Sequence, residues 1–543
     1  MEIEPVPQEI FFERKEILNS LEKRFTAFQQ GYRQNVGLIG SLHTGKSSIV
    51  TQFLKNQTDP FTISILIRFE EADSFQVFCQ KWLGGILRSY HRFLKLPAAH
   101  DFQSLVQQVR RRIPKVLKQM RMAREFAKIK QYDKSYRELL KLPLLLHQET
   151  GHKVLLVLDE FDSLNELPLK DPFAELGKEI MLQTNTMYVV ISSQVKHARE
   201  IFKEKLSLLF SNFEVVEVGN LNFDEAKSSI SSTLGAEFAD SFLGRFLIFV
   251  TNGHPYYLDI LIHRLKQSAS QKKLEPFNQE TLREVLECEL FDHRGTLHQH
   301  FISKLNALSK NRSSSALSDV LLSIALEKKK MQLIALHLGR PVDEIKKNLQ
   351  RLLEEGFIRK RGSFFNIPDF LFRFWLREAY HRKRVSFELD YGEERLAFRR
   401  SLKAFFDRVV CEDEKDLTLR IEELFKKFKN DLVEVDTGKM MCPRFTEIVS
   451  KPSNGRMFPV LAKSSHTSWL CQVVKDRLEE NDVRLFLNDL GQLKNRVQKK
   501  LMIVLRGMDL NAKLLAKETN VQLWDLRDLN ILLDLYGYSK VIL

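Results

Sequence analysis

A glycine-rich loop set between an apolar run and a helix-compatible stretch is the feature that most restricts how this chain folds. The loop, Gly40–Ser47, reads G-S-L-H-T-G-K-S; the apolar run before it ends in Val36–Ile39, and Ser48–Leu54 follows it. In a strand–loop–helix unit the loop N–H groups converge on a phosphate at the positive helix end. Lys46 is then expected to reach the β and γ oxygens of a nucleotide, and the Ser47 hydroxyl to ligate Mg²⁺. Such a string arises by chance in on the order of one chain in a hundred of this length.

A second motif agrees with the first. Lys153–Asp162 reads K-V-L-L-V-L-D-E-F-D, an apolar run typical of a buried strand that ends in two carboxylates. It looks like a Walker B strand, in which Asp159 would hold the Mg²⁺ through water and Glu160 would polarise the water that attacks the γ-phosphate. Paired acids after a strand are also common as a helix cap with a solvated neighbour. Downstream of the phosphate loop, the functional interpretation is the favoured one.

The expected nucleotide contacts are the loop, the residue after it and one residue at a later strand end: Gly40, Ser41, Leu42, His43, Thr44, Gly45, Lys46, Ser47, Ser48 and Ser193. Lys46 and Glu160 are the expected catalytic residues, and Ser47 and Asp159 the expected metal ligands. The polar residues Ser192–Gln194 end a predicted strand, where a side chain could sense the γ-phosphate. A simple turn at the strand end is the equally supported alternative.

Composition bounds the class of protein. A chain of 543 residues is longer than a single hydrophobic core supports, so three or four domains are expected. The cysteines Cys79, Cys288, Cys411, Cys442 and Cys471 are scattered, which argues against a disulfide framework or a zinc site and fits a reducing cytoplasm. The first residues lack a signal-peptide pattern, and no run approaches the roughly 20 apolar residues of a membrane span. We therefore expect a soluble, cytoplasmic protein.

The charge balance favours a polyanionic partner without proving one. The formal net charge is +14, from 84 basic and 70 acidic residues. The densest basic region is 110–141, where apolar residues from Val116 to Ile129 recur at helical spacing. A solvated face of a helical insertion is preferred there over a nucleic-acid contact.

Strand and helix patterns alternate along the first part of the chain. Apolar runs at 36–39, 62–69, 153–158, 187–193 and 213–218 predict strands, with helices at 173–183 and 197–205 between the later ones. Such alternation predicts a parallel α/β sheet covered by helices on both faces. The fold class is therefore multidomain α/β.

From Asn222 the strand signals vanish. Helices are predicted at 224–234, 237–250 and 255–267, the last opened by Pro255, which suits a first helical turn. Predicted helices at 315–326, 331–338 and 342–356, followed by a hairpin at 357–367, have the order of a winged helix-turn-helix. Its third helix carries Lys346, Lys347 and Arg351 for DNA, but acidic neighbours largely offset them. DNA contact and protein packing both stay open for this module.

Several segments together resemble the archaeal-type P-loop ATPases, a STAND-like branch of the AAA+ superfamily. They are the two Walker motifs with Phe12–Leu18, Asn252–Tyr257 and Phe364–Trp375. The resemblance covers roughly residues 10 to 380. It implies an ATPase core at 1–220 with a helical insertion at about 72–150, an all-helical lid at 221–310, a winged helix at 311–385 and a restriction-endonuclease-like domain at 386–543.

Two departures from the family pattern matter. Family members usually carry a Gly-Arg pair before the last core strand, where this chain has Leu208–Phe210 followed by Ser211 and Asn212. The missing cation implies slow hydrolysis, or an arginine from elsewhere such as Arg14 or Arg199.

The second departure concerns the C-terminal part, where predicted strands near 457–461, 468–474, 501–506 and 521–530 and a helix near 483–494 look like the endonuclease-type fold. Its metal site needs an acid and an E-x-K motif. The equivalent positions are Pro459 and Val473–Lys475. We therefore expect an inactive nuclease domain, unless Glu447, Asp436 or Asp476 supplies the missing acid.

The sequence therefore predicts an ATP-binding, slowly hydrolysing ATPase that uses ATP and Mg²⁺ and acts as a nucleotide-dependent switch on DNA. Two alternatives remain: an ATP-gated signalling or defence scaffold, and a non-enzymatic adaptor for oligomerisation without DNA binding. A homo-oligomer or a protein partner is compatible with each.

Overall fold

The computed structural model describes residues 14–542, apart from 58, 71–72, 100, 207–211, 272–276, 309–313, 386–389, 451–459, 466 and 492–496. The chain forms two compact units, Met1–Gly235 with Gly253–Asp259, and Ala236–Asn252 with Ile260–Leu543. The finer division into four domains stays a prediction. Within the described ranges, no helix combines the length and apolar character needed to span a membrane.

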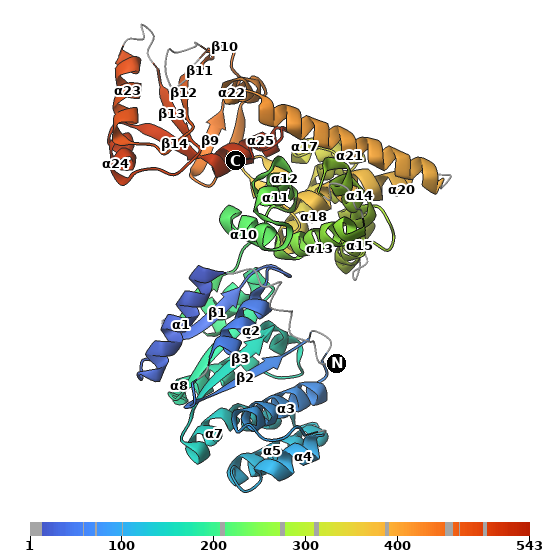
Figure 1. Cartoon of the computed structure of the whole chain (residues 1–543), viewed down its shortest axis with the longest axis vertical. Coiled ribbons are helices and arrows are strands. Elements are labelled where there is room, and N and C mark those ends of the chain that lie inside the picture. Colours follow the sequence, from blue (N-terminus) through green and yellow to red (C-terminus); the bar gives the residue numbers. More distant parts are fainter. Residues whose placement is uncertain are drawn as a thin grey trace. The chain divides into compact units, whose positions relative to one another are not determined.

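The first unit is built on a five-stranded parallel sheet of order β2-β3-β4-β1-β5 (Figure 1). Its strands are β1 (Asn35–Ile39), β2 (Thr62–Arg68), β3 (Lys153–Asp159), β4 (Thr186–Ser192) and β5 (Phe213–Glu217). The predicted parallel α/β fold is confirmed. A parallel sheet whose first strand runs through a glycine-rich loop into a helix is the core of a P-loop NTPase.

The sheet is buried on both faces, which explains the continuous apolar runs of its strands. Along β3, Leu155 and Val157 pack into one cluster with Phe25 of α1 (Lys15–Gln29) and Phe53 of α2 (Lys46–Asn56). The alternate residues of β3, such as Leu156, face a second cluster that includes side chains of α8 (Pro172–Leu182).

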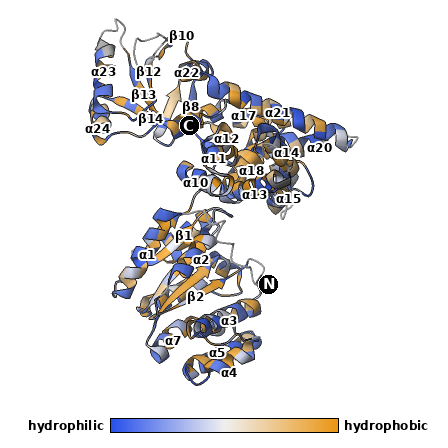
Figure 2. Cartoon of the chain, in the orientation of Figure 1, coloured by the Kyte–Doolittle hydropathy of each residue, from blue (hydrophilic) through white to orange (hydrophobic). Residues whose placement is uncertain are grey.

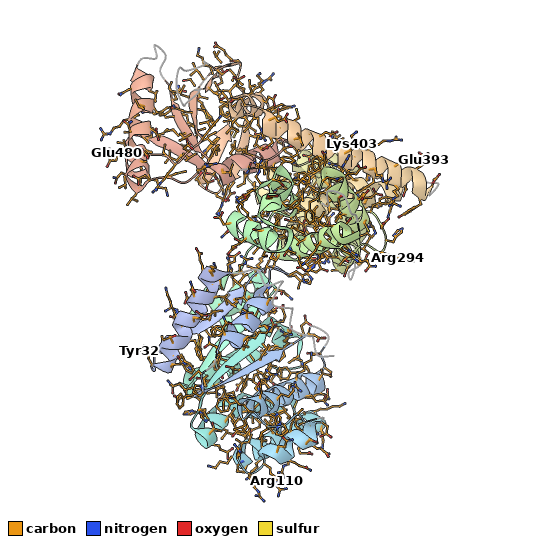
Figure 3. The ribbon with its side chains drawn as sticks, in the orientation of Figure 1. Tyr32, Arg110, Arg294, Glu393, Lys403 and Glu480 are labelled. Atoms are coloured by element: carbon orange, nitrogen blue, oxygen red, sulfur yellow. The ribbon has the colours of Figure 1, made fainter. Side chains whose placement is uncertain are left out.

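Helices occupy the chain between β2 and β3, and the first of them packs beside β2 (Figure 1). They are α3 (Phe75–Phe93), α4 (Phe102–Val109), α5 (Pro114–Lys128), α6 (Tyr132–Leu140) and α7 (Leu142–Thr150). Figure 2 shows helices with mixed hydrophilic and hydrophobic sides around a largely hydrophobic sheet. In α5, Met120 and Ala123 are buried, but Ile129, predicted on the same apolar face, is 60% exposed because the helix has already ended at Lys128. Arg110 lies at the outer end of this group of helices, as Figure 3 shows.

The remaining elements of the first unit follow the strand ends. A 3₁₀ turn, η2 (Phe161–Glu166), follows β3. The helix predicted at 197–205 is divided into α9 (Val195–Glu200) and a π-helical turn, η3 (Ile201–Lys205). The helix α10 (Phe223–Leu234) begins with a capping box in which Asn222 and Glu225 bond each other's backbone.

The second unit opens with helices, as predicted. They are α11 (Ala236–Asp240), α12 (Phe242–Thr251), α13 (Pro255–Gln271, which begins in the first unit), α14 (Gln279–Leu290) and α15 (Thr296–Ala307). The single helix expected at 237–250 is two helices, because the Ser241 side chain accepts a hydrogen bond from the Gly244 N–H and so starts α12 anew.

Three helices and a two-stranded antiparallel ribbon come next. They are α16 (Ser314–Ala325), α17 (Met331–Leu338), α18 (Val342–Glu354), β6 (Arg359–Arg361) and β7 (Phe364–Asn366). Beyond the ribbon lie α19 (Phe370–Trp375), the π-helical turn η6 (Leu376–Tyr380), α20 (His381–Val385) and the long helix α21 (Tyr391–Glu414).

The C-terminal part carries a mixed sheet of order β10-β11-β12-β13-β14. Its elements are α22 (Leu417–Lys426), β8 (Asp431–Val435), β9 (Gly438–Cys442), β10 (Glu447–Ser450), β11 (Val460–Lys463), β12 (Ser468–Val474), α23 (Glu480–Gly491), β13 (Lys499–Val504), α24 (Leu510–Glu518), β14 (Val521–Asp525) and α25 (Leu526–Leu535). The strands β10, β11 and β12 pair antiparallel, whereas β13 and β14 are added in parallel. The strands β8, β9 and β10 were not predicted from the sequence. Parts of two expected elements lie outside the described ranges: residues 457–459 of the strand expected at 457–461, and residues 492–494 of the helix expected at 483–494.

The ribbon β6–β7 packs against β8. The Leu432 carbonyl accepts hydrogen bonds from the Ser363 N–H at 2.8 Å and from the Ser363 hydroxyl at 2.9 Å. Gly362 has a φ of +70°, and a Cβ there would lie 2.2 Å from the same carbonyl oxygen. Arg361 donates to Asp436 at 2.9 Å. The turn of the ribbon is therefore engaged by the C-terminal part of the same unit.

Candidate nucleotide-binding site

The glycine-rich loop joins the carboxyl end of β1 to the start of α2. Gly45 precedes α2 with a φ of +89°, a left-handed conformation that glycine adopts without strain. A Cβ on Gly40 would lie 2.2 Å from the Val218 carbonyl oxygen, so only glycine fits this close approach. The loop thereby leaves the first N–H groups of α2 at the open end of the helix, where an anion is favoured.

A pocket of about 300 Å³ lies at this end of the sheet. Of the expected contacts it is lined by Leu42, His43, Thr44, Gly45, Lys46, Ser47, Ser48 and Ser193, together with Glu160. Gly40 and Ser41 do not line it. Their carbonyls instead accept hydrogen bonds from the Lys46 ammonium at 2.9 and 2.8 Å.

The Lys46 side chain is only 4% exposed. Burial lowers the pKa of its ammonium, and the carboxylates of Glu160, Asp159 and Asp162 act in the opposite direction. The charge is therefore held at the loop by two carbonyls and by nearby acids.

Asp159 ends β3 next to Ser47. It is buried, which raises the pKa of its carboxyl group, while a hydrogen bond with Ser47 and the charges of Arg68 and Lys46 lower it. Arg68, at the end of β2, places its Nε 3.4 Å from Asp159 Oδ2. The other carboxylate oxygen, Oδ1, is buried and has no hydrogen-bond partner among the described residues. A carboxylate oxygen without a partner beside a hydroxyl is the donor set that Mg²⁺ prefers, so these residues fit the expected metal.

Glu160 follows in a left-handed conformation, with a φ of +56°. Its carboxylate accepts the Ser193 N–H at 2.9 Å and also a hydrogen bond from the Ser193 hydroxyl. Adjacent strands thus bring the two residues together, because β3 and β4 end at the same edge of the sheet. Ser193 therefore does more than end a strand: it holds the predicted catalytic carboxylate.

Arginines at or near the site differ in placement. Arg14 lines the pocket and is 6% exposed; its guanidinium donates to the carbonyls of Gly219 at 2.6 Å and Asn220 at 3.1 Å. Arg199 is exposed, pairs with Glu217 and does not line the pocket. Asn212 lies directly before β5 and does not line the pocket either, and 208–211 lie outside the described residues.

The start of α13 supplies a wall of the pocket that the sequence analysis did not identify as part of the site. Pro255, Tyr256 and Asp259 line it, and the Tyr256 ring stacks on the His43 ring with centroids 4.5 Å apart and planes at 19°. His43 itself has a φ of +61°. The only sequence signal was the aromatic pair after a helix-starting proline, which does not reveal a stacking partner more than 200 residues away.

The expected endonuclease positions are dispersed. Val473 is buried in β12, and Lys475 lies 3.9 Å from Asp416. Lys463 pairs with Glu447 at 3.2 Å, and Arg361 pairs with Asp436. Pro459 lies outside the described residues. Among the residues that the structure describes, no group of three or more His, Cys, Asp or Glu side chains is placed to hold a metal.

Comparison with known proteins found no matching family model and no matching curated protein. Among solved structures, the chain is similar to a Walker-type ATPase of Pyrococcus abyssi, with 16% identity over 68% of this chain and 97% of that one and a TM-score of 0.48. It is also similar to the ORC2 protein of Aeropyrum pernix, with 12% identity over 69% and 95% and a TM-score of 0.42. The Holliday junction branch migration motor RuvB of Thermotoga maritima matches with 13% identity over 69% and 97% and a TM-score of 0.31.

Proposed function

We propose that this protein is an ATP-binding, slowly hydrolysing ATPase of the AAA+/STAND type that acts as a nucleotide-dependent switch. One observation carries the proposal. Lys46, Ser47 and Glu160 line a pocket at the first turn of α2, and Asp159, buried at the carboxyl end of β3, lies beside Ser47.

Each residue has a role that its placement supports. The N–H groups at the start of α2 and the Lys46 ammonium would bind the phosphates, the ammonium leaving the carbonyls of Gly40 and Ser41 for phosphate oxygens. Ser47 and the unpartnered oxygen of Asp159 would hold Mg²⁺. The ion would neutralise charge on the β and γ oxygens.

Slow turnover is favoured by two features. In the described part of the first unit, Arg14 is the arginine that lines the pocket, and its guanidinium is engaged by backbone carbonyls. Glu160 is held by both polar groups of Ser193, so it must leave Ser193 to orient a water molecule. A site of this kind would retain its nucleotide, as a switch requires.

Titration of ATP into single variants tests the assignment. Lys46→Ala removes a charge that faces the phosphates, so we expect ATP affinity to fall by at least tenfold. Glu160→Gln should bind ATP like the wild type and lose hydrolysis. Lys55→Ala, at the exposed far end of α2, is the matched control and should change neither property. Unchanged ATP binding by Lys46→Ala would refute the proposed pocket.

Contact with DNA is proposed through α18, taken as the third helix of a winged helix-turn-helix. Lys346 and Lys347 are exposed on this helix, whereas Arg361 in the ribbon is paired with Asp436. Arg359 and Lys360 of the ribbon are exposed as well, so the helix and these two residues together would meet the phosphates. Replacing Lys346 and Lys347 by alanine should reduce the slope of log affinity against log salt by about 1 per lysine.

Two alternatives make different predictions. An ATP-gated scaffold would assemble with ATP and show no salt-dependent DNA affinity. A non-enzymatic adaptor would bind ATP without turnover, even when DNA is present. Measuring ATP turnover with and without DNA, together with the mass of the assembly, separates these alternatives from the proposed DNA-linked switch.

A further inference from the structure

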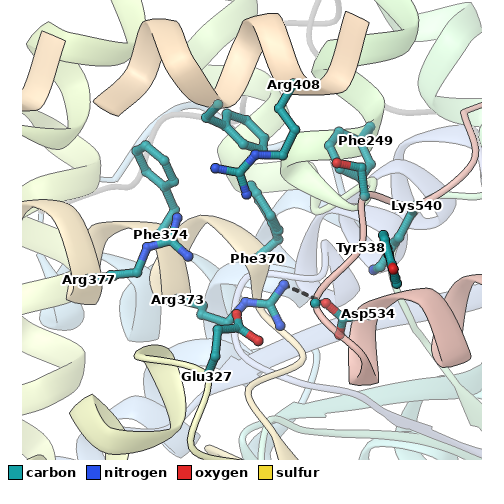
Figure 4. Close-up of a pocket in the computed structure, with 13 residues that line it drawn as sticks. Phe249, Glu327, Phe370, Arg373, Phe374, Arg377, Arg408, Asp534, Tyr538 and Lys540 are labelled. Carbon is teal, nitrogen blue, oxygen red and sulfur yellow. Dashed lines mark hydrogen bonds and ion pairs between the residues drawn. The ribbon is translucent and has the colours of Figure 1, made fainter. Parts of the chain in front are cut away.

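A second pocket lies wholly within the second unit, between α19, α21 and the chain that follows α25 (Figure 4). Its volume is about 50 Å³, which accommodates a group of a few non-hydrogen atoms. One wall is aromatic. The ring of Phe405 lies 5.2 Å from that of Phe370 and 5.4 Å from that of Phe374, between centroids. These rings offer no hydrogen-bond acceptor, so any cation at the pocket must find its counter-charge elsewhere.

Cations outnumber carboxylates in the lining of this pocket. Arg373, Arg377, Arg408 and Lys540 line it, against Glu327 and Asp534. Both carboxylates are already engaged. Arg373 Nη2 donates to Asp534 Oδ1 at 2.6 Å, and Lys329 Nζ lies 2.5 Å from Glu327 Oε2.

Arg377 is engaged as well, since its Nε donates to Glu378 at 2.6 Å. Arg408 has neither a hydrogen bond nor an ion pair with any described residue. Lys540 shares Asp534 with Arg373 and Lys329, and burial lowers the pKa of its ammonium. About two positive charges at the pocket therefore lack a carboxylate of their own.

The buried guanidinium of Arg373 is also incompletely bonded. Arg373 is 8% exposed, and its Nη1 has no hydrogen-bond partner among the described residues. Figure 4 shows Arg408 reaching from α21 toward the part of the pocket that Arg373 and Arg377 occupy. Buried polar groups in folded proteins are nearly always bonded, so the free Nη1 calls for an acceptor.

We propose that this pocket binds a small phosphate-type dianion, held chiefly by Arg373, Arg408 and Lys540. Two negative charges match the two cations that lack carboxylates. Guanidinium groups bind the oxygens of such an anion through paired N–H donors. Inorganic phosphate and the terminal phosphate of a small monoester share this chemistry. A duplex backbone cannot enter a cavity of this size.

Equilibrium dialysis with radiolabelled inorganic phosphate tests the proposal on the full chain. All variants carry Lys46→Ala, so that the phosphate loop of the first unit contributes little to binding. Arg408→Ala should weaken phosphate binding by about tenfold, because it removes a charge-assisted contact. Lys403→Ala, an equal change of charge on the same helix (Figure 3), should leave binding unchanged.

Arg408 is exposed and makes no bond with a described residue, so its loss should not unfold the chain. Circular dichroism without phosphate checks this. Unlabelled phenyl phosphate and unlabelled inorganic phosphate are then compared as competitors of the radiolabelled phosphate. If phenyl phosphate competes at the lower concentration, the ligand is a monoester; if inorganic phosphate does, the ligand is the free ion. Equal phosphate affinity in Arg408→Ala and Lys403→Ala would overturn the proposal. So would displacement of phosphate by a DNA duplex that lacks terminal phosphates.

Discussion

At the scale of a residue, Lys499 shows how burial opposes charge. Its ammonium lies 3.8 Å from the centroid of the Trp469 ring and 5.6 Å from that of Trp524, with the Met440 sulfur 3.7 Å away. Burial lowers the pKa of Lys499 to about 8. Between pH 8 and the ordinary lysine pKa, the unfolded state binds more protons than the folded state. Stability should therefore rise with pH through this window.

Lys499→Met removes the buried charge, so we expect it to raise the free energy of unfolding at pH 7 by on the order of 1 kcal/mol. The variant should also lose the rise in stability between pH 8 and 10. Urea denaturation at pH 7 and pH 9.5 measures both effects. Lys500→Met, at the next position of β13, is the control and should keep the rise. A less stable Lys499→Met at pH 7 would mean that the contact with Trp469 outweighs burial.

Asn212 is the residue where the family pattern has a cation. Asn212 lies directly before β5, at the sheet edge opposite the pocket, so an arginine there would reach the γ-phosphate bound by a neighbouring copy of the chain and not its own. We expect Asn212→Arg to raise the ATP turnover of an assembly of several copies at least tenfold, because an arginine at the γ-phosphate stabilises the charge of the transition state. Asn212→Gln, which adds length without charge, should leave the rate unchanged. Steady-state phosphate release decides between them. An unchanged turnover rate in Asn212→Arg would show that position 212 is not equivalent to the position of the family's arginine.

How far the sequence predicts the site depends on the residue. Lys46, Asp159 and Glu160 were identified because their spacing after apolar runs follows from strand–loop–helix geometry, although their roles stay predictions. The bond between Glu160 and Ser193, and the stacking of His43 on Tyr256, depend on how distant segments meet, which local patterns do not encode.

At the scale of an element, the turn of the ribbon β6–β7 is a point of close packing. Gly362 has a φ of +70° and a Cβ there would meet the Leu432 carbonyl at 2.2 Å. Gly356 also has a positive φ, +76°, but a Cβ added there would have no atom within 4 Å. Gly356→Ala is therefore the matched control, because it introduces the backbone strain without the steric clash. We expect Gly356→Ala to cost about 1 kcal/mol and Gly362→Ala about 2 kcal/mol more. Thermal unfolding measures both, and equal losses would show that the turn has room to move.

Two of the three strands that were not predicted, β9 and β10, have a common physical reason; β8, by contrast, buries alternate residues. The strands of the first sheet are continuous apolar runs because both faces are buried. By contrast, β9 buries only Cys442, and β10 buries none of its four residues. Short, half-exposed strands of this kind lack the continuous run or regular alternation of apolar residues from which strands are predicted.

At the scale of the whole molecule, we expect the chain neither to bind catalytic Mg²⁺ through its C-terminal part nor to cut DNA. Val473 offers no ligand, and Lys475 alone would repel a divalent ion. The basic residues expected to contact a phosphate backbone without chemistry are Lys475, Arg477, Lys494, Arg496, Lys499 and Lys500. Of these, Lys499 lies against the Trp469 ring, and Lys494 and Arg496 lie outside the described residues. Incubation with supercoiled plasmid and Mg²⁺ or Mn²⁺ is the measurement. Reproducible nicking that disappears in Lys475→Ala would contradict this expectation.

The contacts between the ribbon, α19 and the C-terminal strands limit which segments such a protein can exchange with a relative during evolution. Arg373 finds its counter-charge in Asp534, and Lys330 finds its own in Asp431, far along the chain. A partner removed from a buried pair leaves an uncompensated charge that costs about 3–5 kcal/mol. Exchanging the part of the chain after about residue 415 for that of a distant relative would therefore destabilise the fold, unless the relative also carries acids that pair with Arg373 and Lys330. Recombination between such genes is constrained to preserve both ends together.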